Sequence, residues 1–273
     1  MGNIKKTLSL QEIKKIELSI LIEFDKFCKE NNLQYFLCGG TLLGAVRHNG
    51  FIPWDDDVDI AMSRADYSKL QEYFMQHKEE LKPYEFFSKE TRENYPYMIG
   101  RVCNTDFVMK SEIEGDYGMG TFIDIYPMDG AGNGRAFLPF VKSRLFSSMY
   151  YMKSRTHFIS SEEKYLNIPK RIIFSFVHLF SYKFLRKNLE RLVYRFDYDK
   201  SEYVAQMDCF SDGKKNMYLK KDLEETVYHE FEGYQVKIPR NYDAMLRQLY
   251  GDYMQLPPEE KRIGHHVYSI YKK

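Results

Sequence analysis

The sequence predicts a protein of the α+β class, in which a mixed β-sheet core is flanked by helices. The first observation behind this prediction is that helical and strand-like segments follow one another through residues 1–131. The second is that residues 136–196 are helical in tendency, basic and rich in Phe and Tyr, which indicates a mainly helical insertion. We therefore expect three parts: a core over 1–131, a basic helical insertion over 132–200, and a C-terminal portion over 201–273 that returns to the core.

The core is predicted to begin with an amphipathic helix over 9–31, where apolar residues recur at helical spacing. A short buried strand over 34–38 then runs into Gly39 and Gly40, and residues 41–47 are predicted to form one helical turn. The glycine pair thus lies on a strand-to-helix junction, where backbone N–H groups are available to a phosphate. The remaining segments are predicted as helices over 64–78 and 242–250, strands over 57–60, 84–87, 98–103, 107–109, 121–127, 203–207, 225–231 and 234–239, and a turn at Asp129–Gly130.

An acidic cluster follows the glycine pair and consists of Asp55, Asp56, Asp57 and Asp59. Clustered carboxylates repel one another and favour solvent or a cation. The alternation with Val58 and its neighbours places Asp57 and Asp59 on one face of a strand. Carboxylates at the edge of a core, just after a glycine turn, indicate a divalent cation bound to a phosphorylated ligand. The competing interpretation is a solvated acidic loop that caps the next helix.

Asp124 lies in the middle of the apolar strand predicted over 121–127. An unpaired buried charge costs on the order of several kcal/mol, so Asp124 needs a partner. On a strand adjacent to Asp57 and Asp59, it would supply the third carboxylate of a Mg2+ site. Three carboxylates beside a phosphate cradle meet the requirement for phosphoryl or nucleotidyl transfer.

Several further residues are candidates for the same site. Arg47 and His48 lie between the glycine pair and the acidic cluster, where they could contact phosphate or belong to a surface loop. Arg101 lies among strand-like residues and is a candidate phosphate contact. The pair His265 and His266 follows two prolines near the end of the chain and is either part of the site or ordinary surface.

The net charge of +1 hides a strong asymmetry along the chain. Residues 135–195 carry 13 Lys or Arg against 3 Asp or Glu, a net charge of +10, which leaves −9 for the rest. The basic stretch predicts docking to a phosphate-rich acceptor or to the anionic inner leaflet of a membrane, with the solvated face of an ordinary helical subdomain as the alternative. No motif supports nucleic-acid binding. Unpaired cysteine spacing and the lack of an apolar N-terminal segment predict a cytoplasmic protein.

The motifs together resemble the LicD family of phosphocholine transferases, whose core is shared with fukutin and fukutin-related protein. The resemblance is carried by GGTLLGAVRHNGFIPWDDDVDIAM, by FIDIYPMDG and by the late YGDYMQLPPEEKR. Within the first string, a glycine turn precedes an acid–hydrophobic–acid–hydrophobic strand, which resembles the nucleotidyltransferase-fold signature. The resemblance therefore implies a nucleotidyltransferase-like core.

The resemblance also implies transfer of phosphocholine from CDP-choline to a sugar hydroxyl of a cell-surface glycan. This acceptor would be a teichoic acid precursor or a lipooligosaccharide, and it would be either lipid-linked or soluble. By analogy, Mg2+ or Mn2+ would be held by Asp57, Asp59 and Asp124, which would also be catalytic. Nucleotide phosphates would be bound by the stretch Gly39, Gly40 and Thr41. Trp54 would cover the choline head group or would anchor the fold. Alternatives are another CDP-activated group, such as ribitol phosphate or phosphoethanolamine, or a non-catalytic nucleotide- or choline-binding protein.

Overall fold

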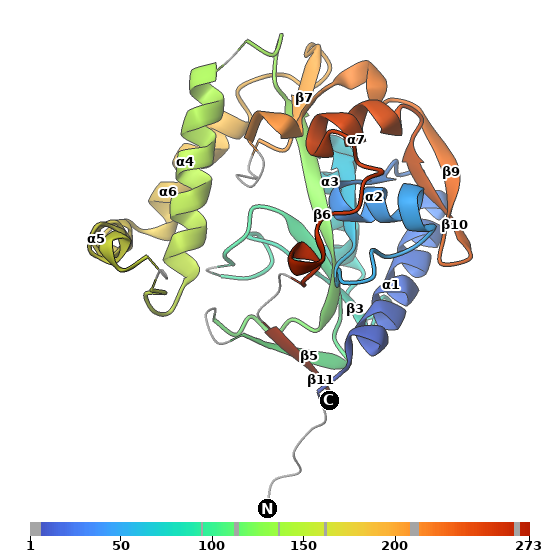
Figure 1. Ribbon diagram of the computed structural model, residues 1–273, viewed down its shortest axis with the longest axis horizontal. Helices are drawn as coiled ribbons and strands as arrows, with labels where there is room; N and C mark the ends of the chain where they lie inside the picture. The colour runs from blue at the N-terminus through green and yellow to red at the C-terminus, as the bar shows by residue number, and fades with distance from the viewer. Residues whose placement is uncertain are drawn as a thin grey trace, which may run out of the picture.

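The structure is a computed structural model that describes residues 7–93, 95–111, 115–135, 137–160, 163–207, 213–264 and 268–273. A mixed β-sheet forms its centre and helices flank it, so the predicted α+β class is confirmed. Figure 1 shows strand β6 running through the middle of the molecule, with α1 and α2 on one side and α4, α5 and α6 on the other.

Strand β6 organises the main sheet because it pairs along both edges. The strands of the main sheet follow the order β1-β2-β6-β4-β3, and β7, which carries β8 on its other edge, pairs with the last two residues of β6. Strands β2 and β6 are parallel, whereas β6 is antiparallel to both β4 and β7. The bounds are β1 (Phe36–Leu37), β2 (Asp59–Ser63), β3 (Tyr84–Phe87), β4 (Gly100–Asn104), β6 (Thr121–Gly130), β7 (Tyr203–Ala205) and β8 (Met217–Leu219).

Two separate strand pairs lie outside the main sheet. The C-terminal strand β11 pairs with β5, and β9 pairs with β10 in a hairpin. The predicted turn at Asp129–Gly130 is wrong, because both residues belong to β6 and pair with β7. An Asp-Gly pair favours a turn locally, but here the ladder to β7 keeps the chain extended. The bounds of these strands are β5 (Phe107–Ser111), β9 (Thr226–Phe231), β10 (Tyr234–Pro239) and β11 (Tyr268–Lys272).

The N-terminal helix α1 (Leu10–Glu30) forms as its amphipathic pattern predicts. Ser9 and Glu12 form a reciprocal capping box, which satisfies two N–H groups that a helix start leaves without partners. Helix α2 (Gly39–His48) is longer than the single turn predicted, and it begins at the glycine pair itself. The other helices are α3 (Arg64–Gln76), α4 (Phe137–Ser154), α5 (Asn167–His178), α6 (Tyr182–Val193) and α7 (Tyr242–Tyr250). Within the described ranges, none of the helices combines the length and the hydrophobicity that crossing a membrane requires.

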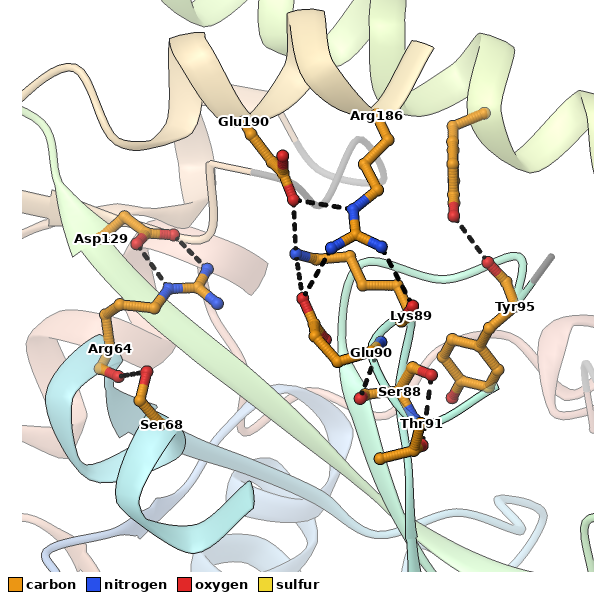
Figure 2. A network of polar contacts seen from close by, with 11 residues as sticks. Arg64, Ser68, Ser88, Lys89, Glu90, Thr91, Tyr95, Asp129, Arg186 and Glu190 are labelled. Carbon is orange, nitrogen blue, oxygen red and sulfur yellow. Dashed lines mark hydrogen bonds and ion pairs between the residues drawn. The ribbon is translucent and has the colours of Figure 1, made fainter. Parts of the chain in front are cut away.

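The helical part is fastened to the sheet by an ion-pair network (Figure 2). On α6, Arg186 Nε donates to Glu190 Oε1 at 2.9 Å, and Lys89 Nζ, from the segment after β3, donates to the same oxygen at 2.9 Å. Arg186 also reaches Glu90 Oε1 at 3.3 Å. Beside this network, an apolar cluster joins α4 and α6 to β7 and β8. The boundaries predicted at 131 and 200 stay predictions, although the C-terminal segments do pack on the core.

Candidate active site

Two acidic side chains lie next to each other on the central strands. Asp59 opens β2, Asp124 lies within β6, and the two residues are direct partners in the parallel register of these strands. Asp124 N donates to Val58 O at 2.8 Å, which holds the register at this point. Partners in a ladder point to the same face of a sheet, so both carboxylates share one face. The expectation that Asp124 lies on a strand adjacent to that of Asp59 is confirmed.

Asp57 lies outside the strand that was predicted to carry it. Strand β2 begins at Asp59, so placing Asp57 and Asp59 on one strand face is corrected to Asp59 alone. The alternation in burial still holds, because Val58 and Ile60 are fully buried while Asp57 and Asp59 are partly exposed. The apolar side chains therefore fix the backbone from 58 onward, and Asp57 extends the acidic surface from the preceding loop.

Both glycines at the start of α2 lie against carboxylates. A Cβ at Gly39 would lie 2.7 Å from Asp59 Oδ2, and a Cβ at Gly40 would lie 2.7 Å from Asp55 Oδ2. Gly39 also has a φ of +55°, which favours glycine. Cys38 at the N-cap makes no side-chain capping bond, and the first N–H groups of a helix have no partner within it. The glycines thus allow acidic side chains close to a helix end that attracts anions.

Burial and like charge act together on Asp59. Burial raises the pKa of Asp59 well above its ordinary value, and the charges of Asp57 and Asp124 raise it further, while a hydrogen bond with Tyr126 acts in the opposite direction. The Oδ1 atom of Asp59 is buried and has no hydrogen-bond partner within the part of the chain that the structure describes. A carboxylate oxygen held in this way is available to a cation or to a proton.

Asp124 has the partner that its burial demands, and that partner is Arg101. The two residues face each other across β4 and β6, and Arg101 Nε donates to Asp124 Oδ1 at 2.6 Å. The guanidinium lies 4.1 Å from the ring centre of Tyr97 and 4.0 Å from that of Phe122. Burial is the largest single influence and acts to lower the pKa of Arg101, but the charge and hydrogen bond of Asp124, together with Tyr97 and Tyr95, raise the pKa well above its ordinary value. Arg101 therefore orients a site carboxylate, and its contact with a phosphate stays a prediction.

Thr41 also orients the acidic strand. Its buried Oγ1 accepts a hydrogen bond of 2.8 Å from Asp59 N. This bond ties the first turn of α2 to the first residue of β2, so the hydroxyl positions Asp59. A phosphate contact by Thr41 stays a prediction.

Arg47 and His48 lie at the opposite end of α2 from the glycine pair, about 12 Å away at ~1.5 Å of rise per residue. Arg47 Nε donates to His48 Nε2 at 3.0 Å, and Arg47 Nη1 donates to Tyr253 O at 2.9 Å. The guanidinium of Arg262 lies 5.7 Å from the ring centre of Trp54. The structure does not bring Arg47 and His48 together with the glycine pair, and Trp54 lies edge-on to His48 with ring centres 6.5 Å apart. Their roles stay predictions, and His265 and His266 lie outside the described residues.

A cavity of about 110 Å³ opens at the glycine pair and Asp59. Its far wall comes from the C-terminal portion, which the sequence analysis did not connect with the site. Gln206 and Asn216 are buried polar residues of this wall, and the hydroxyl of Tyr218 donates to Asn216 Oδ1 at 3.1 Å. The other lining residues are Cys38, Tyr126, Met245, Leu249 and Tyr250. No local pattern marks the polar wall residues, because only the fold carries them to the glycine pair.

Glu17 on α1 is a further acidic residue that the sequence analysis missed. Its side chain is fully buried, and neither carboxylate oxygen has a hydrogen-bond partner among the described residues. Burial raises the pKa of Glu17 well above its ordinary value, and the charges of Asp57 and Asp56 raise it further. One turn earlier, Lys14 Nζ donates to Ile52 O at 2.8 Å, so this part of α1 covers the loop that carries the cluster. A glutamate within the apolar stripe of α1 was the available signal.

Comparison with known proteins supplies the family. A family model described as LicD/FKTN/FKRP, nucleotidyltransferase domain, matches residues 32–189. Over 270 residues the chain is 30% identical to the lipopolysaccharide cholinephosphotransferase LicD of Haemophilus influenzae. The aligned region covers 97% of this chain and 99% of that protein. The chain belongs to the LicD family.

Shorter stretches of this LicD-family chain resemble other proteins. It is 38% identical over 79 residues to an uncharacterised protein of Rickettsia prowazekii. That aligned region covers 26% of this chain and 30% of the Rickettsia protein. It is 45% identical over 40 residues to the ribitol 5-phosphate transferase FKRP of Homo sapiens. That aligned region covers 15% of this chain and 8% of FKRP. The last likeness supports the relationship to fukutin-related protein that the sequence motifs indicated.

The LicD resemblance implies a divalent cation, and the chemistry of the site fits one. Carboxylate oxygens are the ligands that Mg2+ prefers, and Asp59 and Glu17 both hold buried oxygens that lack partners among the described residues. Among those residues, however, no three His, Cys, Asp or Glu side chains converge closely enough to hold an ion. A cation bound by three protein carboxylates therefore requires at least one side chain to turn toward the others.

Proposed function

We propose that this chain transfers phosphocholine from CDP-choline to a sugar hydroxyl of a cell-surface glycan precursor, either a lipopolysaccharide or a teichoic acid, with Mg2+ or Mn2+ as its cofactor. The observation that carries the proposal is the likeness to a LicD cholinephosphotransferase along nearly the whole chain. Family membership supports a phosphotransferase, and the transferred group is taken from that relative. A nucleotidyltransferase-like core is part of the same proposal.

The proposal assigns the donor to the cavity at the start of α2. The N–H groups of the first turn, at Gly39, Gly40 and Thr41, would bind the nucleotide phosphates, because a helix N-terminus attracts anions. Asp59 and Asp124, which share one face of the sheet, would hold the cation together with Asp57. A bound cation would neutralise the charge that develops on the phosphate during transfer.

In the transfer step, the acceptor oxygen forms a bond to the phosphorus that carries choline, and the bond from that phosphorus to CMP breaks. The acceptor proton passes to a carboxylate, for which Asp59 is favoured over Asp124 by two observations. The Oδ1 atom of Asp59 is buried and has no hydrogen-bond partner among the described residues, so it can accept a proton. Asp124 is instead held by the guanidinium of Arg101. Asp59 would therefore accept the proton, and Asp124 would keep its hydrogen bond with Arg101.

The test is release of CMP and transfer of choline by the purified chain, given CDP-choline, Mg2+ and an isolated glycan acceptor. We expect Asp57→Ala and Asp59→Ala each to reduce turnover by at least about a hundredfold, because removal of one key charge-stabilising group commonly costs this much. Asp106→Ala is the matched control, since Asp106 is an exposed carboxylate in the turn between β4 and β5. Turnover that survives both site substitutions would refute the assignment of the acidic cluster.

A second candidate is the transfer of a different CDP-activated group. The likeness to a ribitol 5-phosphate transferase over 40 residues favours CDP-ribitol as the first alternative donor. Competition of CDP-ribitol and CDP-ethanolamine against CDP-choline in the same assay separates these donors. A chain that binds CDP-choline without releasing CMP would instead be the non-catalytic binding protein considered from the sequence.

The remaining sequence predictions belong to this proposal. Trp54 would cover the trimethylammonium group by a cation–π contact, which requires Arg262 to leave the ring face that it now approaches. Arg47, His48 and Arg101 would contact phosphates only after rearrangement. The reaction would take place in the cytoplasm at the inner face of the membrane, where lipid-linked glycan precursors would be presented.

A further inference from the structure

Helix α5 presents an apolar stripe to the outside of the molecule. Ile168, Ile172, Phe176 and Leu179 recur about one turn apart, and 73%, 65%, 54% and 80% of their respective surfaces are exposed. The first three lie on α5 and the last is its C-cap residue. Residues at this spacing share one face of a helix. Single exposed apolar residues are normal on a protein surface, but a continuous stripe along one helix indicates a partner.

Helix α5 exposes its longer apolar face, whereas an ordinary surface helix turns that face toward the core. Val177 is almost completely buried, and Phe174 packs edge-on against Phe158 with ring centres 6.0 Å apart. These two residues lie three apart and define the face that contacts the protein, so the longer apolar stripe points away from it. Figure 1 shows α5 at the outer edge of the helical part, on the side away from α1. The stripe therefore does not contribute to the cores of the described chain.

Basic residues border the stripe. Lys170 and Arg171 on α5 are exposed, as are Lys164 just before the helix and Lys183 at the start of α6. Helix α5 contains no acidic residue, and the stretch 135–195 that surrounds it carries the net charge of +10. An exposed apolar stripe with flanking cations is typical of helices that lie in a membrane interface.

The charge also decides between two occupants of the stripe. A second copy of this chain in a symmetric dimer would place the same basic stretch against itself, and like charges repel. An anionic lipid surface instead complements both the cations and the apolar side chains. At ~1.5 Å per residue the helix is about 18 Å long, which is too short to cross a hydrocarbon core of roughly 30 Å, so it would lie in the plane of the surface.

We propose that α5 is an interfacial helix that docks the protein on an anionic lipid bilayer, with Ile168, Ile172 and Phe176 entering the headgroup boundary and Lys170 and Arg171 contacting lipid phosphates. The docking of α5 rests on the proposed function only for the choice of the inner leaflet of the membrane. It adds to that function the segment of the chain that contacts the lipid. The identity of the transferred group does not enter it. Docking through α5 would hold the site near acceptors that are themselves attached to the membrane.

The test is co-sedimentation of the full chain with vesicles of phosphatidylcholine alone, or of phosphatidylcholine and phosphatidylglycerol in equal amounts. We expect binding to the anionic vesicles, and a loss of at least about tenfold in partition for the double variant Ile172→Ser, Phe176→Ser. The double variant Lys170→Glu, Arg171→Glu is expected to lose a similar factor, and high salt should reproduce only this second loss. Met75→Ser on α3 is the matched control, because Met75 is an exposed apolar residue away from the helical part.

Three outcomes would overturn the proposal. The first is a full chain that does not bind anionic vesicles, and the second is an Ile172→Ser, Phe176→Ser variant that is folded by circular dichroism and binds like the unmodified chain. The third is a dimer that dissociates in this variant while no vesicle binding is found, which would assign the stripe to a second copy. Release of CMP in solution with a soluble acceptor is measured in parallel. That measurement tests the proposed function and should not respond to the α5 variants.

Discussion

Replacing Glu17 by glutamine is expected to stabilise the protein when no divalent cation is present. Glu17 is fully buried without a hydrogen-bond partner in the described part of the chain, and the charges that act on it most strongly are those of Asp57 and Asp56. Leaving a buried polar group unsatisfied costs ~1–3 kcal/mol, and more when the group is charged. Glutamine keeps the shape but cannot ionise, so we expect the free energy of unfolding at about pH 8 to rise by at least about 1.4 kcal/mol, the equivalent of a pKa shift of one unit.

The sign of the pH dependence follows from the raised pKa of Glu17. Burial and neighbouring carboxylates lift this pKa well above its ordinary 4.5, so the folded state holds the proton more tightly than the unfolded state. Glu17 therefore costs no stability below pH 4.5, and its cost grows as the pH rises from there to the folded pKa. The gain from Glu17→Gln should accordingly be small at about pH 5 and larger at about pH 8.

The assay is urea unfolding in the presence of a chelator, repeated with added Mg2+ or Mn2+. The cation should stabilise the unmodified chain more than the Glu17→Gln variant, because the variant lacks one of the buried carboxylates near the site. Glu23→Gln on the exposed side of α1 is the matched control and should change the unfolding free energy by less than about 0.5 kcal/mol. A Glu17→Gln variant that is less stable in chelator, or that responds to the cation as strongly as the unmodified chain, would refute the reasoning.

Three other predictions concern the glycine pair, the partner of Asp124 and the ion-pair network at α6. Gly39→Ala should cost about 1–2 kcal/mol of stability from its positive φ, and should also abolish CMP release because its Cβ would meet a site carboxylate at 2.7 Å; Gly233→Ala has a similar φ and open space, so it should lose stability alone. Arg101→Met should cost ~3–5 kcal/mol in urea unfolding because it strands Asp124, and adding Asp124→Asn should recover part of that loss. Burial acts to raise the pKa of Glu190, but Arg186 and Lys89 together lower it below its ordinary 4.5. The stability from its ion pairs should therefore be lost as the pH falls below 4.5, and faster hydrogen exchange in α6 should detect this loss.

Local patterns in the sequence were sufficient to locate the centre of the candidate site. The alternation around Asp59 marks a strand because Val58 and Ile60 must be buried, and this burial is observed. The apolar run around Asp124 marks a second strand that has to pair its one charge. The glycine pair lies at the start of α2. Because glycine has no side chain, the carboxylates of Asp59 and Asp55 can approach this helix start closely.

The order of the strands could not be predicted, because no local period encodes which strands become neighbours. The arrangement β2-β6-β4 places Asp124 between Asp59 and Arg101, so that Arg101 is the partner of a carboxylate that the sequence did not assign to it. The polar wall with Gln206 was missed for the same reason. Glu17 was overlooked because the apolar stripe of α1 explains the helix without it. Each omission concerns contacts between segments far apart in the chain.

The parallel pairing of β2 with β6 has a consequence for synthesis of the chain. Parallel neighbours require a long crossover, and here the far wall of the cavity is added only by residues 206–250. Contacts between segments distant in sequence form slowly, because the intervening chain must be ordered first. While the ribosome is still producing the last quarter of the protein, the acidic cluster has no closed cavity around it. A nascent or truncated chain would therefore lack the closed cavity at the glycine pair until residues 206–250 have packed on the core.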